Sequence, residues 1–188
     1  MLVSKREVKI LDFDIETRPL SYWIPDGRPT AEISAIASCW IGYPDSMQVT
    51  LLGVHESEYM LSKFIERYNE ADIVTGHYIR MFDLPQINGA VLEFGLGKLE
   101  DKLTSDTKMD LVKKGDIPAT QEYLAELFEL EHPKIQMSQV KWRKANRLTP
   151  EGIRETFQRV SGDVRQHMEL RAVLLEKGLL KGPKIWQP

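Results

Sequence analysis

The sequence predicts an α/β protein built on a mixed five-stranded sheet with helices on both faces. Three observations indicate this fold. Three β-rich segments open the chain, helix and strand signals alternate after them, and a turn signal at 43–46 separates the second segment from the third. Alternating helices and strands favour parallel pairing, whereas a short turn joins antiparallel strands. We therefore expect a mostly parallel sheet with one antiparallel strand near its start.

The expected elements follow one another in a regular order. Strands are predicted at 8–16, 33–42, 48–53, 73–74 and 106–111, and helices at 56–69, 85–94, 121–130 and 150–177. The first helix is indicated by an apolar repeat at helical spacing, formed by Leu61, Phe64, Ile65 and Tyr68. Pro85 suits the first turn of the second helix.

Length and composition limit the class of protein. A chain of 188 residues with 42% apolar and 28% charged residues fits one folded domain over 1–188 and excludes a disordered chain. The single cysteine, Cys39, excludes a disulfide framework and indicates a reducing compartment. No apolar run is as long as a membrane span, and the N-terminal stretch lacks the apolar core of a signal peptide. We therefore expect a soluble, cytoplasmic protein with no membrane partner.

The charge is distributed unevenly along the chain. The net charge is −3, but residues 134–171 hold nine Lys and Arg against four Asp and Glu, so this segment carries +5 and the remainder −8. Such asymmetry is typical of a protein that binds a polyanion with one region and cations with another. A solvated helical face would give the same count, so charge alone does not decide between the two.

The stretch LDFDIETRP, residues 11–19, places acids inside an apolar strand. Side chains on a strand alternate between faces, so Asp14 and Glu16 point the same way, with Cα atoms about 6.6 Å apart. They also lie at the C-terminal end of the strand, where open α/β sheets bind ligands. Two carboxylates at this separation can share a divalent cation, although D-x-E alone is a common tripeptide.

Two further acids occur in comparable contexts. Asp83 follows a loop that leaves a buried strand at Gly76, and it precedes a helix, where an acid also interacts favourably with the helix dipole. Asp163 lies on the apolar face of the last helix, which also carries Val160, Val164, His167 and Leu170. An acid in an apolar stripe indicates a functional site, and an ion pair with a neighbouring arginine is the structural alternative.

Three sequence blocks carry a family resemblance. FDIET, GHYIRMFDLP and GDVRQHMEL, in this order, resemble the three motifs of the DEDD 3′–5′ exonuclease superfamily, whose fold is ribonuclease H-like. The likeness is greatest to the proofreading domain of family B DNA polymerases and to its stand-alone exonuclease relatives. The stretches EADIVTGH, SDTKMDLVKK and QEYLAELFEL also fit, so the resemblance runs from about residue 8 to residue 178.

The resemblance implies a site for two metal ions. Asp14, Glu16 and Asp163 would hold one ion, and Asp14 would hold the second together with Asp83, through water. Mg²⁺ or Mn²⁺ suits these hard oxygen ligands. Two such ions about 4 Å apart would activate the attacking water and stabilise the leaving 3′ oxygen. Asp12, where the family usually has an apolar residue, is expected to be a buried, hydrogen-bonded acid and not a ligand.

The third motif departs from the family pattern. The family has a Tyr four residues before the last Asp, or a His five residues before it, and this chain has Arg159 and Gln158 there. His167 lies one turn beyond Asp163 and is expected to be a core residue. An arginine cannot act as a base but can bind a phosphate oxygen bidentately. We expect Arg159 to clamp the scissile phosphate, with an ion pair to Asp163 or Glu155 as the alternative.

Aromatic, apolar and basic side chains are the candidates for substrate contacts. The loop after the first metal ligands can stack on bases or wedge between them, although Trp23 could equally pack under its own loop. Basic residues around a Trp match a surface that follows the phosphate backbone, as would a half-buried Trp with basic neighbours. The candidate substrate-binding residues are Thr17, Leu20, Trp23, Tyr78 (in place of the family's usual Asn), Lys141, Trp142 and Arg143.

The sequence as a whole predicts a metal-dependent 3′–5′ exonuclease that prefers single-stranded DNA to RNA. Its expected catalytic residues are Asp14, Glu16, Asp83, Asp163 and Arg159. Two alternatives stay open. A metal site that binds phosphates does not itself distinguish deoxyribose from ribose, so a 3′–5′ exoribonuclease is one. A nucleic-acid-binding module that lost turnover with its tyrosine is the other.

Overall fold

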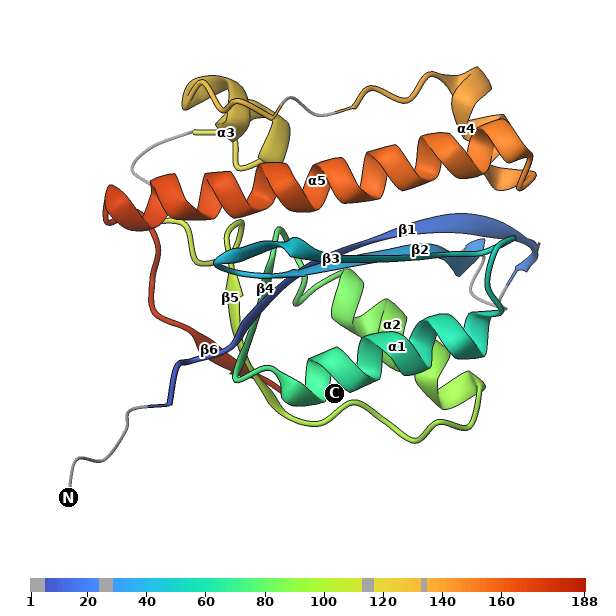
Figure 1. The fold of residues 1–188 in the computed structure, drawn as a ribbon, viewed down its shortest axis with the longest axis horizontal. Coiled ribbons are helices and arrows are strands. Elements are labelled where there is room, and N and C mark those ends of the chain that lie inside the picture. The colour runs from blue at the N-terminus through green and yellow to red at the C-terminus, as the bar shows by residue number, and fades with distance from the viewer. Residues whose placement is uncertain (1–5, 24–28, 113–116, 133–134) are drawn as a thin grey trace.

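The computed structural model describes residues 6–23, 29–112, 117–132 and 135–188. The described chain forms one six-stranded sheet in the order β3-β2-β1-β4-β5-β6, with helices on both faces (Figure 1). The strands are β1 (Ile10–Trp23), β2 (Pro29–Trp40), β3 (Tyr43–Leu51), β4 (Ile73–Gly76), β5 (Lys102–Asp106) and β6 (Lys184–Trp186). The helices are α1 (Ser57–Glu70), α2 (Asp83–Glu93), α3 (Gln121–Leu127), α4 (Gln139–Asn146) and α5 (Pro150–Glu176).

The strand directions confirm the predicted mixed sheet. β1 pairs in parallel with β4, and β4 with β5, while β2 is antiparallel to both of its neighbours, β1 and β3. A sixth strand, β6, pairs antiparallel with β5 and was not predicted from the sequence. The sequence predicted one antiparallel strand. The described sheet has two strands, β2 and β6, that run antiparallel to β1.

The alternation of side chains along β1 explains its unusual sequence. Leu11, Phe13 and Ile15 are buried in the main core, on the face covered by α1 and α2, where Phe13 packs on Phe64 with ring centroids 4.9 Å apart. The acids between them therefore point to the opposite face, under α5 (Figure 1). The two sides of this one strand thus differ in role, since one builds the core and the other carries charge.

The long helix α5 lies close to the sheet because the strands below it carry small side chains. Ala35, Ala37 and Cys39 of β2 are fully buried against Val160 and Val164 of α5. The helix begins at Pro150, after Thr149, whose hydroxyl accepts the N–H of Gly152 as an N-cap. The close packing brings the polar residues of α5 to the acids of β1.

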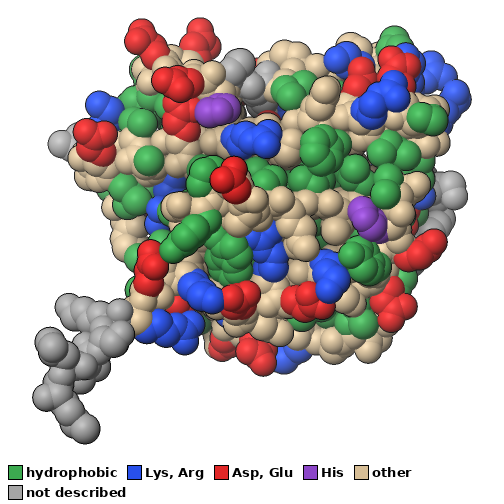
Figure 2. Space-filling view, in the orientation of Figure 1, with side chains coloured by type: hydrophobic (Ala, Val, Ile, Leu, Met, Phe, Trp, Pro, Cys, Tyr) green, Lys and Arg blue, Asp and Glu red, His purple; other side chains and the backbone are tan. Residues whose placement is uncertain are grey.

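The side chains on the face drawn in Figure 2 mix both signs of charge. Over α4 and the start of α5, basic and acidic side chains lie together, because Lys141 pairs with Glu155 and Lys144 with Glu151. The basic segment at 134–171 is thus partly neutralised by its own acids. No helix of the described chain is long and apolar enough to cross a membrane.

Candidate metal centre

Three carboxylates meet where α5 crosses the middle of β1, which continues to Trp23 and does not end at residue 16 as predicted. Asp14 and Glu16 come from β1, and Asp163 comes from the middle of α5. One oxygen of each lies within 4.8 Å of the others. Carboxylates at such a distance repel one another unless cations lie nearby. The side-chain alternation of β1 and the apolar stripe of α5 thus bring together the three residues that the sequence motifs singled out.

Asp83 lines the same pocket from the first turn of α2. Its side chain is buried, and its Oδ1 accepts the backbone N–H of Ile15 at 3.2 Å. Burial raises the pKa of Asp83 to about 7; hydrogen bonds from the backbone N–H groups of Ile15 and Asp83 oppose this rise, and the charges of Asp106 and Glu16 add to it. A cation in the pocket would favour the ionised form. Asp83 lies outside the close group of three.

The pocket has a volume of about 280 Å³ and is lined by several residues that the sequence did not single out. Gln121 is one of them, and its side-chain amide donates to the backbone carbonyl of Asp163 at 3.0 Å. This contact ties α3 to α5 beside the acids. The other lining residues not predicted as site residues are Ile15, His77, Phe82, Lys108 and Thr120. A signal existed for His77, which follows the strand that ends at Gly76, whereas the strand predicted at 106–111 concealed the loop position of Lys108.

The guanidinium of Arg159 lies between two of the carboxylates. Its Nε is 3.1 Å from Oε1 of Glu16 and 2.9 Å from Oδ2 of Asp163, and Nη1 donates to the carbonyl of Ile135 at 2.5 Å. The side chain is only 13% exposed. The ion pair with Asp163 that was the structural alternative is therefore present, whereas Glu155 pairs with Lys141.

Asp12 and His167 form a buried hydrogen-bonded chain, as expected of core residues. Nδ1 of His167 is 2.7 Å from Oδ2 of Asp12, and Nε2 is 2.9 Å from the hydroxyl of Thr107. That hydroxyl is 2.9 Å from Nδ1 of His77, whose Nε2 is 2.9 Å from the carbonyl of Ala119. The chain links β1, α5 and the ends of β4 and β5 behind the acidic pocket.

The carbonyl of Ala119 sets the direction of the hydrogen bonds in this chain. A carbonyl only accepts, so Nε2 of His77 carries hydrogen, and Nδ1 of a neutral ring accepts from Thr107. Thr107 then accepts from Nε2 of His167, whose Nδ1 faces the carboxyl of Asp12. Burial raises the pKa of Asp12, opposed by the charges of His167 and Arg171 and by the hydrogen bond with His167.

The expected substrate contacts are distributed over three places. Of the candidates whose side chains the structure describes, only Tyr78 lines the pocket. Thr17 and Leu20 are half-buried on β1, beyond a register shift that follows Glu16, and the side chain of Trp23 lies outside the described residues. On α4, Lys141 and Trp142 are half-buried and Arg143 is exposed. The contacts of these residues with a substrate stay predictions.

The fold and an acidic cluster that can hold a metal define the class of protein: an α/β protein with a mixed six-stranded sheet and a carboxylate-lined pocket. A similar solved structure is the family B DNA polymerase from the hyperthermophilic archaeon Pyrobaculum calidifontis, with a TM-score of 0.63 and 17% identity. The match covers 90% of this chain but 25% of the polymerase chain, so it spans about a quarter of that protein. The match supports the ribonuclease H-like fold implied by the motifs. No family model and no curated protein matches the sequence.

Proposed function

We propose that the protein is a metal-dependent 3′–5′ exonuclease that hydrolyses the terminal phosphodiester bond of single-stranded DNA. The observation that carries the proposal is the convergence of Asp14, Glu16 and Asp163, whose oxygens lie within 4.8 Å of one another. These acids belong to a fold shared with a DNA polymerase. An acidic pocket is a poor place for a phosphate unless a cation mediates the contact, so the acids and the proposed substrate together require a metal.

The residues present fit Mg²⁺ or Mn²⁺. Four carboxylates line the pocket against the two cationic side chains of Arg159 and Lys108, and hard oxygen donors are the ligands these ions prefer. Asp14, Glu16 and Asp163 would hold one ion, and Asp14 and Asp83 the other. When bound, the ions would supply an activated water and charge stabilisation at the leaving oxygen.

The side chains of the protein would position the strand end in this pocket. Arg159 holds Glu16 and Asp163 through Nε, and its guanidinium can donate further N–H groups to an oxygen of the scissile phosphate. A guanidinium stays protonated at working pH, so Arg159 stabilises charge and does not accept a proton. Gln121 fixes the turn of α5 that carries Asp163. Tyr78 lines the pocket, and we expect a strand end, and not a continuous duplex, to enter beside it.

Digestion of end-labelled strands tests this proposal. With Mg²⁺ or Mn²⁺, a 5′-labelled single-stranded DNA should give a ladder shortened from its 3′ end, and a circular single strand should survive. Asp14→Asn should abolish the ladder, while the exposed-acid control Glu93→Gln should leave it unchanged. An RNA strand of the same sequence measures the sugar preference. Nicking of the circle would contradict the proposal and indicate an endonuclease.

A second candidate function is favoured by one observation. Arg159 already forms ion pairs with Glu16 and Asp163, and so supplies a positive charge where a metal would lie. A binding module that retained the fold and lost turnover would have this arrangement. An inert parent protein that gains cleavage on Arg159→Tyr would identify such a module.

A further inference from the structure

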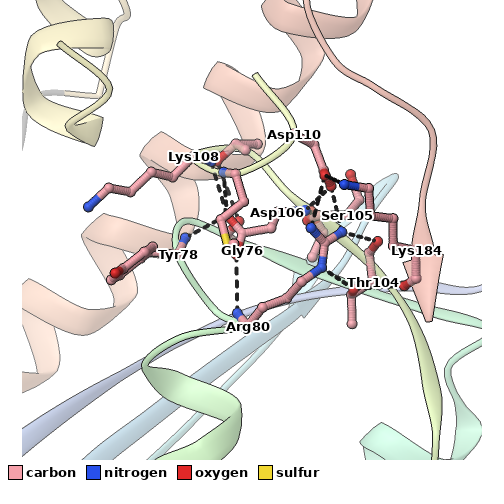
Figure 3. Close-up of polar contacts among 12 residues, drawn as sticks. Gly76, Tyr78, Arg80, Thr104, Ser105, Asp106, Lys108, Asp110 and Lys184 are labelled. Atoms are coloured by element: carbon pink, nitrogen blue, oxygen red, sulfur yellow. Dashed lines mark hydrogen bonds and ion pairs between the residues drawn. The ribbon is translucent and has the colours of Figure 1, made fainter. Parts of the chain in front are cut away.

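A tyrosine and a lysine form a cation–π contact at the edge of the acidic pocket. Tyr78 follows β4 and Lys108 follows β5, and Nζ of Lys108 is 3.8 Å from the centroid of the Tyr78 ring. Both residues line the pocket that contains the four acids. Figure 3 shows the two side chains extending the same way, away from the cluster around Asp110. The pair therefore presents a ring and a positive charge on the wall of an acidic site.

The backbone of Tyr78 is held in a conformation that few large side chains adopt. Its φ is 73°, in the left-handed region, which is unfavourable for a residue with a Cβ and costs about 1 kcal/mol or more in a non-glycine residue. The conformation is kept by the buried carboxylate of Asp106, which accepts the N–H of Tyr78 at 2.9 Å and that of Arg80 at 3.1 Å. Strain of this kind is found where a site requires a particular geometry.

The same carboxylate fixes the position of the lysine. Asp106 also accepts the N–H of Lys108 and of Met109, each at 3.0 Å, so one buried acid holds both loops through four backbone donors (Figure 3). Behind it, the guanidinium of Arg80 bonds both oxygens of Asp110, at 2.9 and 2.5 Å. The ring and the ammonium are therefore placed by a rigid support, as a preorganised binding site requires.

The cationic groups of Lys108 and Arg159 have different neighbours. Arg159 is directed at two carboxylates, whereas Lys108 lies over an aromatic ring, which attracts a cation without neutralising it. The positive charge of Lys108 thus stays available for a phosphate. Tyr78 and the neighbouring Phe82, which also lines the pocket, are residues with 37% and 41% of their surface exposed. These rings offer the flat apolar surface on which a base stacks.

We propose that Tyr78 and Lys108 form a subsite for the terminal nucleotide of a single strand, in which Tyr78 stacks on the base and Lys108 binds the adjacent phosphate. The inference rests on the proposed function and adds the residues that recognise the strand end. Asp106 is a positioning residue for both. The two contacts have different physical signatures, because stacking is insensitive to salt and a phosphate contact is not.

The test measures binding of a fluorescent ten-nucleotide single-stranded DNA with a hydrolysis-resistant 3′-terminal linkage, at a fixed Mg²⁺ concentration, over a range of salt concentrations and without turnover. Tyr78→Asn removes the ring and suits the backbone, because asparagine tolerates positive φ. It should melt no lower than the parent and bind about tenfold more weakly at every salt concentration. An oligonucleotide whose 3′ residue lacks its base should bind the parent weakly and show no further loss with Tyr78→Asn.

The lysine is tested by the salt dependence of the same measurement. Lys108→Ala should make the slope of log K against log salt shallower by about 0.7, the value for one phosphate contact of a single strand. Lys108→Arg should keep the parent slope, and the exposed-lysine control Lys98→Ala should also leave it unchanged. Parent-like affinity and slope for Tyr78→Asn and Lys108→Ala would overturn the subsite, whatever the activity. If the parent protein binds the strand without cleaving it, and both variants bind it more weakly, the nuclease proposal is overturned and the subsite is retained.

Discussion

At the scale of single residues, substitution of Arg159 tests whether its guanidinium competes with a metal ion for the carboxylates. Because its guanidinium lies 3.1 Å from Glu16 and 2.9 Å from Asp163, it competes with a divalent cation for the same oxygens. Arg159→Ala should therefore tighten Mn²⁺ binding, measured by titration calorimetry. It should also lower kcat about a hundredfold, the effect of removing one preorganised donor. Arg159→Lys keeps the charge and should bind Mn²⁺ like the parent, whereas weaker Mn²⁺ binding by Arg159→Ala would contradict the competition.

Asp110 gives a second prediction at this scale. Burial alone would raise the pKa of its carboxyl, but hydrogen bonds from Arg80 and from the N–H of Asp106 outweigh burial and hold the pKa below 3.8. An acid whose pKa is lowered on folding stabilises the protein above its unfolded pKa, and this contribution is lost as the pH falls through the folded value. Asp110→Asn breaks a buried ion pair and should cost about 3 kcal/mol at pH 7.

The pH dependence of this loss separates charge from packing. In urea titrations, the gap in unfolding free energy between the parent and Asp110→Asn should narrow as the pH falls below about 4. The exposed-acid control Asp45→Asn should remain within about 0.5 kcal/mol of the parent at each pH. A gap of constant size from pH 7 to pH 3 would show that the lost hydrogen-bond geometry, and not the carboxylate charge, is responsible.

At the scale of elements, the contact between α4 and α5 depends on one glycine. A Cβ at Gly152 would lie 2.3 Å from the carbonyl oxygen of Lys144, in the backbone of α4. Gly152→Ala should therefore push α4 away and destabilise the protein by about 1 to 3 kcal/mol, the cost of overpacking. Gly89→Ala in α2 meets nothing within 4 Å and should instead stabilise by about 0.5 to 1 kcal/mol. Urea unfolding measures both, and equal effects would contradict the close contact.

The elements that the sequence predicted are those with a clear periodicity. The apolar stripe of α5 and the alternation of β1 are each long enough to be recognised, and the helix predicted at 150–177 is observed as Pro150–Glu176. The three-residue β6 is too short for any alternation. The eight-residue α4 is dominated by polar and basic residues, so its helical period was not recognised. Pairing with neighbouring elements, and not local pattern, decides such short segments.

The candidate site also contains residues that the sequence predicted and residues that it did not. The convergence of Asp14, Glu16 and Asp163 was predicted because the resemblance of the three motifs implied that these residues share a metal ion. The part played by Asp106 was not. The sequence placed a strand at 106–111, whereas β5 ends at Asp106 and the loop of Lys108 follows. An error of a few residues in a strand boundary thus hid the carboxylate that holds both loops.

At the scale of the whole molecule, acids from three elements meet in one pocket beside the sheet. Asp14 and Glu16 of β1, Asp83 of α2 and Asp163 of α5 all line one pocket, and the ionisation of Asp83 is opposed by burial and by the charges near it. Elements from three parts of the chain are therefore held together against mutual repulsion in the apo protein. A ligand that binds the folded state and not the unfolded state stabilises by mass action.

Divalent metal should therefore raise the melting temperature of the whole protein. At a concentration about a hundredfold above Kd, Mg²⁺ or Mn²⁺ contributes about 2.7 kcal/mol, which corresponds to roughly 5 to 10 °C for a chain of this size. Thermal melting in EDTA and in millimolar Mn²⁺ measures the shift. Asp14→Asn removes the carboxylate common to both proposed ions and should abolish it, while Asp45→Asn, an exposed acid of β3, should retain it. Because the melting shift requires no substrate and no turnover, identical melting curves in EDTA and Mn²⁺ would reject the metal centre even in a protein that binds DNA.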